Sequence, residues 1–121
     1  MKFTRETPAA VTIRQVTSDA IVIGEQSFTG TIALTPAALL EGFACPPVAE
    51  LDVSHFELLL ATEPELVLLG TGSRNIFPPR ELMFAFARRG VGFEVMDTPA
   101  AARTFNVLAG EGRHLGAVLY L

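Results

Sequence analysis

The hydrophobic pattern of the sequence changes near residue 52, and this change limits the fold more than any other feature. Residues 65–70, ELVLLG, and 116–121, GAVLYL, are continuous apolar runs, whereas residues 79–89 have helical spacing. A short continuous apolar run is typical of a strand that is buried on both faces in a parallel sheet. With GFEVM at 92–96 and a third helix before the last strand, the order strand–helix–strand–helix–strand predicts right-handed crossovers and parallel strands.

Local signals set the expected ends of the helices. Ser54 and Glu57 have the spacing of a capping box, in which each side chain bonds the backbone N–H of the other residue. Gly90 follows two arginines and is placed to end the second helix. Thr98 is the expected N-cap of the third helix, and Gly110 is its expected end.

The first third of the chain indicates antiparallel strands. Residues 11–16, 20–23 and 31–34 are β-branched and apolar, and polar breaks separate them. A loop that contains Gly42 comes next. The expected fold class is therefore α/β, with a parallel β-α-β-α-β C-terminal part and antiparallel N-terminal strands. A chain of 121 residues is expected to form a single domain, residues 1–121.

Composition limits where the protein works. Half of the residues are hydrophobic, yet no apolar run reaches the roughly 18 residues that a membrane-spanning helix needs. The N-terminus, MKFTRETPAA, lacks the apolar core of a secretory signal. Cys45 is the only cysteine, which excludes an internal disulfide and fits a reducing compartment. We therefore expect a cytoplasmic protein with no membrane span.

Several kinds of chemistry lack the residues that they need. The net charge is −4, and the small basic excess in residues 74–121 does not make a nucleic-acid surface, so no nucleic acid is expected. His55 and His114 are the only histidines, and they do not have the spacing of metal ligands, so no metal site is expected. We find no nucleophile elbow and no phosphate loop with a lysine, so no catalytic residue and no cofactor is assigned. Cys45 is interpreted as a small apolar filler rather than a reactive thiol.

One group of polar residues is a candidate ligand site. Ligands of parallel sheets bind beyond the carboxyl ends of the strands, where the loops after residues 70 and 96 would meet. The candidate ligand-binding residues are Gly70, Thr71, Gly72, Arg74, Asp97 and Thr98. A dinucleotide site is disfavoured, because Asn75 stands where the fingerprint needs a third glycine. The competing interpretation is a tight glycine turn after a buried strand.

A second group of residues has no evident role within the fold. At about 100° per residue, Phe105 faces the sheet, and Arg103 and Asn106 then point away from it. In the second helix, Phe84 lies between two arginines on the side opposite the apolar face. The candidate interaction surface consists of Phe84, Arg103, Asn106 and Arg113. For Phe84 the alternative is that a further layer of the fold, such as the N-terminal hairpins, covers it.

These residues together resemble a known family. The match covers about residues 11–121. Its most specific parts are the leucine-rich strand into Gly70-Thr71-Gly72 and, further on, Met96-Asp97-Thr98, Ala101, Arg103-Thr104, Asn106-Val107-Leu108 and Glu111-Gly112-Arg113. The sequence resembles the small-domain family that includes the mitochondrial respiratory complex I assembly factor 3 and its uncharacterised bacterial relatives. Ala102 and Phe105 stand where that family commonly has a cysteine and a tyrosine, and its tryptophan in the middle loop is missing.

The resemblance implies a three-layer α/β domain with a central mixed sheet, and it implies no reaction. The leading hypothesis is a non-enzymatic protein-interaction domain, acting as an assembly or scaffold factor with a protein partner that the sequence does not identify. The alternative is a protein, or an enzyme, that binds a small molecule or an anion through the Gly70–Arg74 loop with Asp97 and Thr98. Self-association is a further expectation, because the apolar surplus must be buried either at an interface or by dense packing.

Overall fold

The computed structural model describes residues 11–40 and 43–121 of the chain, so the expectations for the N-terminal segment and for Gly42 lie outside the described residues. The strands of the described part are β1 (Ile13–Val16), β2 (Ile21–Ile23), β3 (Gln26–Phe28), β4 (Ile32–Leu34), β5 (Leu66–Thr71), β6 (Gly92–Met96) and β7 (Leu115–Tyr120). Its helices are the 3₁₀ turns η1 (Val48–Glu50) and η2 (Val53–Phe56) and the α-helices α1 (Glu57–Leu60), α2 (Arg80–Arg89) and α3 (Thr98–Gly110).

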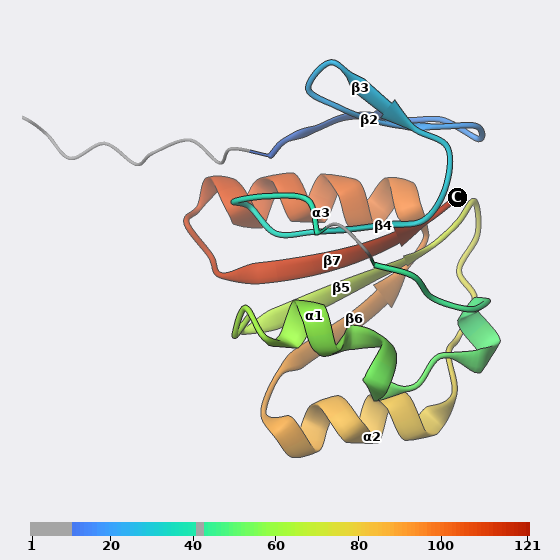
Figure 1. Cartoon of the computed structure of the whole chain (residues 1–121), viewed down its shortest axis with the longest axis vertical. Coiled ribbons are helices and arrows are strands. Elements are labelled where there is room, and N and C mark those ends of the chain that lie inside the picture. Colours follow the sequence, from blue (N-terminus) through green and yellow to red (C-terminus); the bar gives the residue numbers. More distant parts are fainter. Residues whose placement is uncertain (1–10, 41–42) are drawn as a thin grey trace, which may run out of the picture.

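The main sheet has four strands in the order β4-β7-β5-β6 (Figure 1). β5 lies parallel to both β6 and β7, and β4 runs antiparallel to β7. The predicted parallel β-α-β-α-β part is therefore confirmed as β5-α2-β6-α3-β7, and the sheet as a whole is mixed. β1, β2 and β3 form a separate antiparallel sheet. The sequence did not indicate β3. It also did not indicate that β4 pairs with β7 in the main sheet rather than with the N-terminal strands.

The helices cover both faces of the main sheet (Figure 1). α3 packs against β5 and β7 on one face, and the small sheet β1–β3 lies over the outer side of α3. α1, η2 and α2 lie on the opposite face. Neighbouring residues of β5 point to opposite faces, so Leu68 joins the core beneath α3 while Val67 and Leu69 join the core that contains Phe86 of α2. The three-layer arrangement is confirmed, and the small sheet is added to it.

The first helix has a different cap from the predicted one. η2 begins after Asp52, whose Oδ1 accepts a hydrogen bond from Ser54 N at 2.9 Å. The Asp52 N–H in turn donates to His55 Nδ1 at 3.0 Å. The predicted box of Ser54 with Glu57 is therefore wrong, because Asp52 and His55 already close the first turn two residues earlier. The α-helical part, α1, is a single turn.

Both ends of α3 also differ from the prediction, whereas the end of α2 does not. Asp97, and not Thr98, is the N-cap of α3, because its Oδ1 accepts an amide hydrogen bond from the first turn at 2.8 Å. Thr98 is the first helical residue and is buried. Gly110 is still helical, and Gly112, with a φ of 79°, makes the left-handed turn. Gly90 ends α2 in the left-handed conformation, as predicted.

Candidate functional site

The carboxyl edge of the main sheet brings part of the predicted ligand site together. The loop after β5 meets the start of α3 there, and the end of β7 lies beside them. Gly72 N donates to Thr98 Oγ1 at 2.8 Å, and Thr98 N donates to the Gly72 carbonyl at 2.8 Å. Thr98 Oγ1 donates to the Tyr120 carbonyl at 2.5 Å. The Thr98 hydroxyl therefore both accepts and donates within the fold.

The backbone amides at the start of α3 already have partners. A helix N-terminus binds anions through first-turn N–H groups that have no other acceptor. The Thr98 N–H bonds the preceding loop, and Pro99 has no N–H. The next two amides, of Ala100 and Ala101, donate to the side chain and the carbonyl of Asp97 at 2.8 and 2.9 Å. No amide in this described turn is left to bind an anion.

Packing and turn geometry account for the two glycines of this loop. A Cβ at Gly70 would lie 2.9 Å from Thr98 Oγ1 and 3.0 Å from Thr98 Cα, so α3 approaches the strand closely only because Gly70 has no side chain. Gly72 has a φ of +108°, which residues with a side chain rarely adopt. Thr71 Oγ1 donates to the Arg74 carbonyl at 2.7 Å and so fixes the loop after β5.

Arg74 and Asp97 do not meet Thr98 in a common pocket. A hollow of about 430 Å³ lies beside Gly72 and Thr98, and Tyr120 forms part of its wall. Neither Arg74 nor Asp97 lines it. The described residues that line this hollow include no charged side chain, so the structure does not bring the six predicted ligand-binding residues into one site.

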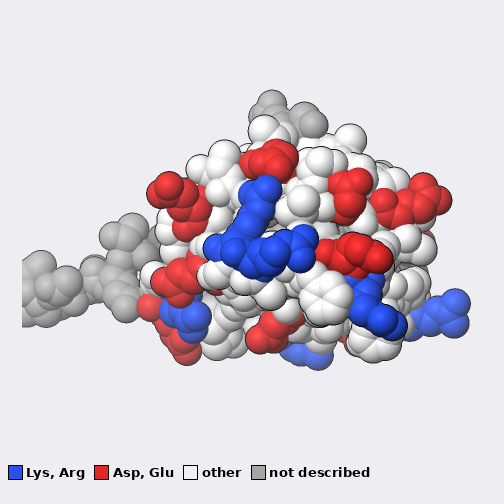
Figure 2. Space-filling model, turned by 90° about the horizontal axis from the view of Figure 1, so that it is seen from below, with Lys and Arg blue, Asp and Glu red and all other residues white. Residues whose placement is uncertain are grey.

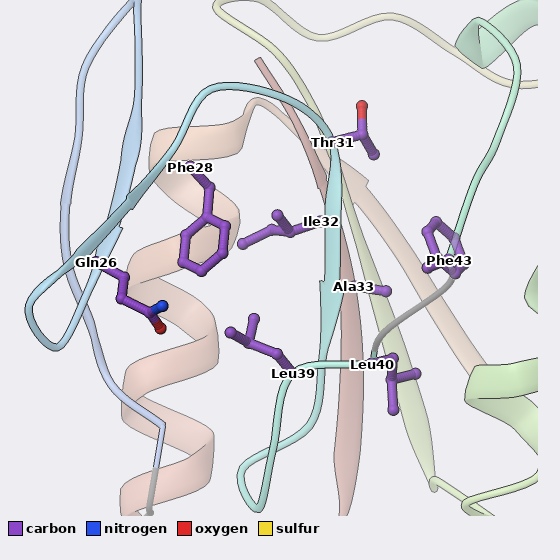
Figure 3. Close-up of a pocket in the computed structure, with 8 residues that line it drawn as sticks. All are labelled: Gln26, Phe28, Thr31, Ile32, Ala33, Leu39, Leu40 and Phe43. Carbon is purple, nitrogen blue, oxygen red and sulfur yellow. The ribbon is translucent and has the colours of Figure 1, made fainter.

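A second hollow, of about 320 Å³, lies beside the edge strand β4 (Figure 3). Phe28, Ile32 and Leu39 point towards one another there, and Phe43 lies on the other side of β4 (Figure 3). The sequence analysis missed this hollow because three separate segments of the chain build its walls. The described residues that line it include no charged side chain, so this hollow has no acid, base or ionic group for catalysis.

The outer face of α2 presents the exposed aromatic residue that the helical spacing indicated. Phe84 is 53% exposed, so no described layer of the fold covers it. Leu82 and Phe86, on the opposite side of the helix, are buried in the core. Figure 2 looks onto this side of the molecule and shows basic side chains near the middle of the face, with acidic and uncharged ones around them. Phe84 is thus available for a contact outside the described fold.

Asn106 points away from the main sheet as expected, but it is bonded within the fold and so is not available for the expected external contact. Its Oδ1 accepts from Ile13 N at 3.0 Å, and its Nδ2 donates to the Ile13 carbonyl at 2.8 Å. The helical projection assumed one packed face, whereas the small sheet also packs on the outer side of α3. Arg103 is exposed as expected, and Arg113 is exposed with its Nε 3.2 Å from Glu65 Oε1.

Cys45 lies beside the hydroxyl of Tyr120 and is half-buried. Burial raises the pKa of the Cys45 thiol, and the Tyr120 hydroxyl offsets this rise only in part. Burial also raises the pKa of Tyr120, whose hydroxyl donates to the Pro46 carbonyl at 2.6 Å. Because only the thiolate is a strong nucleophile, a raised pKa disfavours Cys45 as a reactive thiol near neutral pH.

Comparison with known proteins identifies the family. A family model described as a protein of unknown function (DUF498/DUF598) matches residues 13–120. The chain belongs to this family. A bovine relative named NADH dehydrogenase (ubiquinone) 1 alpha subcomplex assembly factor 3 is 34% identical over 117 residues, which is 95% of this chain and 63% of that protein. The resemblance seen in the sequence is therefore confirmed.

Bacterial proteins are also similar to this chain, in sequence and in structure. A Francisella tularensis protein named 13 kDa major membrane protein is 33% identical over 72 residues, 60% of this chain and 58% of that protein. The NMR structure of a Xanthomonas campestris protein has a TM-score of 0.84 at 35% identity and covers 99% of this chain and 92% of that one. The chain thus spans less than two thirds of the bovine and Francisella proteins. Within residues 11–40 and 43–121, no helix could cross a membrane.

Proposed function

We propose that this chain is a non-enzymatic protein-interaction domain that acts as an assembly or scaffold factor. Relatives with assembly factor in their names align with nearly its whole length, which supports a role of this kind. The observation that carries the proposal is the exposed Phe84 on the outer face of α2. Aromatic residues and arginine are enriched in the cores of protein interfaces, and Phe84 lies beside exposed arginines on this helix.

The alternative of a small-molecule or anion site lacks a comparable observation. The groups that would bind an anion at the sheet edge are bonded to one another, and Arg74 lies outside the nearby hollow. A site there would need those internal bonds to break first. Protein contact is therefore the function that the geometry supports best.

The proposal includes a cytoplasmic location. Because one relative is named a membrane protein, cell fractionation is the appropriate measurement for this part. We expect the tagged chain in the soluble fraction at physiological salt. Recovery in the membrane pellet after a high-salt wash would contradict the location and leave the interaction role to be tested separately.

Reciprocal purification tests the interaction role. The tagged full chain is expressed in its own host, crosslinked in the cell and purified, and each captured protein is then tagged and used to recover the chain. We expect at least one partner that passes in both directions and elutes with the chain at a larger mass. Elution of the gently extracted chain at the mass of one copy, without any reciprocal partner, would contradict the proposal. Elution as a multiple of this chain alone would show self-association instead.

A further inference from the structure

The outer face of α2 has a composition that the stability of the helix does not explain. We define the α2 surface as Arg80, Met83, Phe84 and Arg88. Glu81 is also exposed beside it, about 20° from Arg88 around the helix axis, so the arginines outnumber the acidic side chain on this side of α2. At about 100° per residue, Phe84 lies between the two arginines on the side of the helix opposite the buried residues. Both Arg80 and Arg88 are exposed, and neither has an ion pair among the described residues.

The inner side of α2 is complete without these residues. The Phe86 ring stacks on Phe93 with centroids 4.2 Å apart and meets the edge of Phe56 at 5.2 Å. Arg89, at the end of the helix, lies 3.5 Å from Glu57 and so joins α2 to α1. The packing and the ion pair of α2 therefore come from residues outside the α2 surface.

The position of Arg80 is unfavourable for the helix itself. The N-terminus of an α-helix carries a partial positive charge, so acidic residues stabilise the first turn and basic residues destabilise it. Arg80 is the first residue of α2. Glu81 follows in the same turn and offsets this cost only in part, so helix stability does not account for Arg80, and an acidic partner would.

We propose that the α2 surface docks an acidic amphipathic helix of another protein, a proposal that rests on the interaction role proposed above. Arg80 and Arg88 are eight residues apart, which is about 12 Å along a helix axis, with Phe84 midway. A matching helix carries an apolar side chain over Phe84 and Met83 and carboxylates about two turns apart that meet the two arginines. The apolar contact supplies most of the affinity, and the charges set the orientation.

A second copy of this chain is a poorer occupant of the same surface. A two-fold axis through Phe84 would place Arg80 of one copy over Arg88 of the other in an antiparallel pair of helices. Like charges across such a contact repel, and this repulsion discriminates against self-association. Glu81 offsets only one of the two arginines that each copy contributes, so the charge pattern favours an acidic partner over a second copy.

Photo-crosslinking tests where the partner binds. The full chain carries a photoreactive phenylalanine analogue at position 84 or, as a matched control, at position 107, because Val107 is 59% exposed on α3 in the opposite layer. We expect an adduct from position 84 only, mapped to an acidic amphipathic segment of the partner. An adduct with another copy of this chain, or with a segment that is not acidic, would overturn the proposal.

Charge reversal tests what the partner recognises. Arg80→Glu is favoured by the helix dipole and should fold at least as well as the wild type, yet it should lose most of the adduct. Arg103→Glu makes the same charge reversal on an exposed residue of α3, and this variant should still form the adduct with the partner. Undiminished capture by Arg80→Glu would overturn the proposal even though a partner exists.

A defined probe gives a second readout. A synthetic helix with one leucine between two glutamates seven residues apart should shift the NMR signals of residues 80–88, and its glutamine version should bind roughly three- to tenfold more weakly, the effect of two exposed ion pairs. Equal binding of the two peptides would count against the charge pattern. A partner captured only from position 107 would show that the partner does not bind the α2 surface, although the chain still has an interaction role. A complete lack of reciprocal partners would remove that role itself.

Discussion

Gly70→Ala is expected to destabilise the protein, although the substitution adds only a methyl group. The new Cβ would lie 2.9 Å from Thr98 Oγ1, 3.0 Å from Thr98 Cα and 3.0 Å from Leu119 Cδ2. The backbone atom cannot rotate away as the end of a side chain can. The methyl group therefore pushes the start of α3 away from the sheet and strains the two hydrogen bonds between Gly72 and Thr98.

Two opposing effects set the size of the loss. Overpacking of a well-packed site costs about 1–3 kcal/mol, and the backbone clash puts this site in the upper half of that range. Alanine restricts the unfolded chain and returns about 0.4–1 kcal/mol. We therefore expect the free energy of unfolding to fall by about 2 kcal/mol. Gly110→Ala is the matched control, because its added Cβ meets nothing within 4 Å apart from its chain neighbours and the backbone of its own helix.

Urea denaturation at equilibrium measures both variants. Gly70→Ala should lower the midpoint with an unchanged slope, whereas Gly110→Ala should leave it unchanged or raise the stability by up to about 1 kcal/mol. A Gly70→Ala variant as stable as the wild type would refute the close approach of α3 to β5. Equal losses in both variants would show that the effect belongs to glycine in general and not to this contact.

Three other places in the fold give further predictions. Asn106→Ala removes both hydrogen bonds to β1 and should lower the free energy of unfolding by about 1–3 kcal/mol in the same urea experiment. Val107→Ala, the control, should lower it by less than ~0.5 kcal/mol. Equal losses would show that Asn106 does not hold the small sheet against α3. Hydrogen bonds from Ser54, first from its side chain and then from its backbone, lower the pKa of Asp52, so this carboxylate stabilises the fold above its unfolded pKa of about 4, and the stabilisation is lost as the pH falls through the lowered value. Ser54→Ala should raise the pKa of Asp52 in an NMR titration, and an unchanged pKa would show that the side chain is not the cause. Cys45 should react slowly with thiol reagents at pH 7 and rapidly once the chain unfolds, and fast labelling of the native protein would contradict its burial.

The C-terminal half of the fold could be predicted because its signals are local. β5 and β7 are continuous apolar runs, and each is buried on both faces, as their sequences require. Gly90 follows two arginines in the sequence, and it ends α2 in the left-handed conformation that this pattern predicts. The same kind of reasoning found that the loop after β5 meets Thr98, since the ends of neighbouring parallel strands lie together.

The remainder depended on contacts between distant segments. The sequence of β4 resembles that of β2, and its pairing with β7 rather than with the hairpins cannot be inferred from its own residues. Asn106 was assigned to the outside because no local signal shows that the small sheet covers α3. The sequence indicated a cap at the start of α3 but not that Asp97 provides it, nor that the Thr98 hydroxyl bonds the loop after β5 and the end of β7.

The two hydrogen bonds between Asn106 and Ile13 have a consequence for the time at which the protein can fold during synthesis. These residues are 93 positions apart in the chain. At ribosomal rates of ~5–20 residues per second, the N-terminal strands leave the ribosome about 5–20 seconds before the helix that covers them is complete. During that interval the isoleucines of β1 and β2, which are buried in the finished fold, face water. β1 and β2 are thus made well before the helix that covers them.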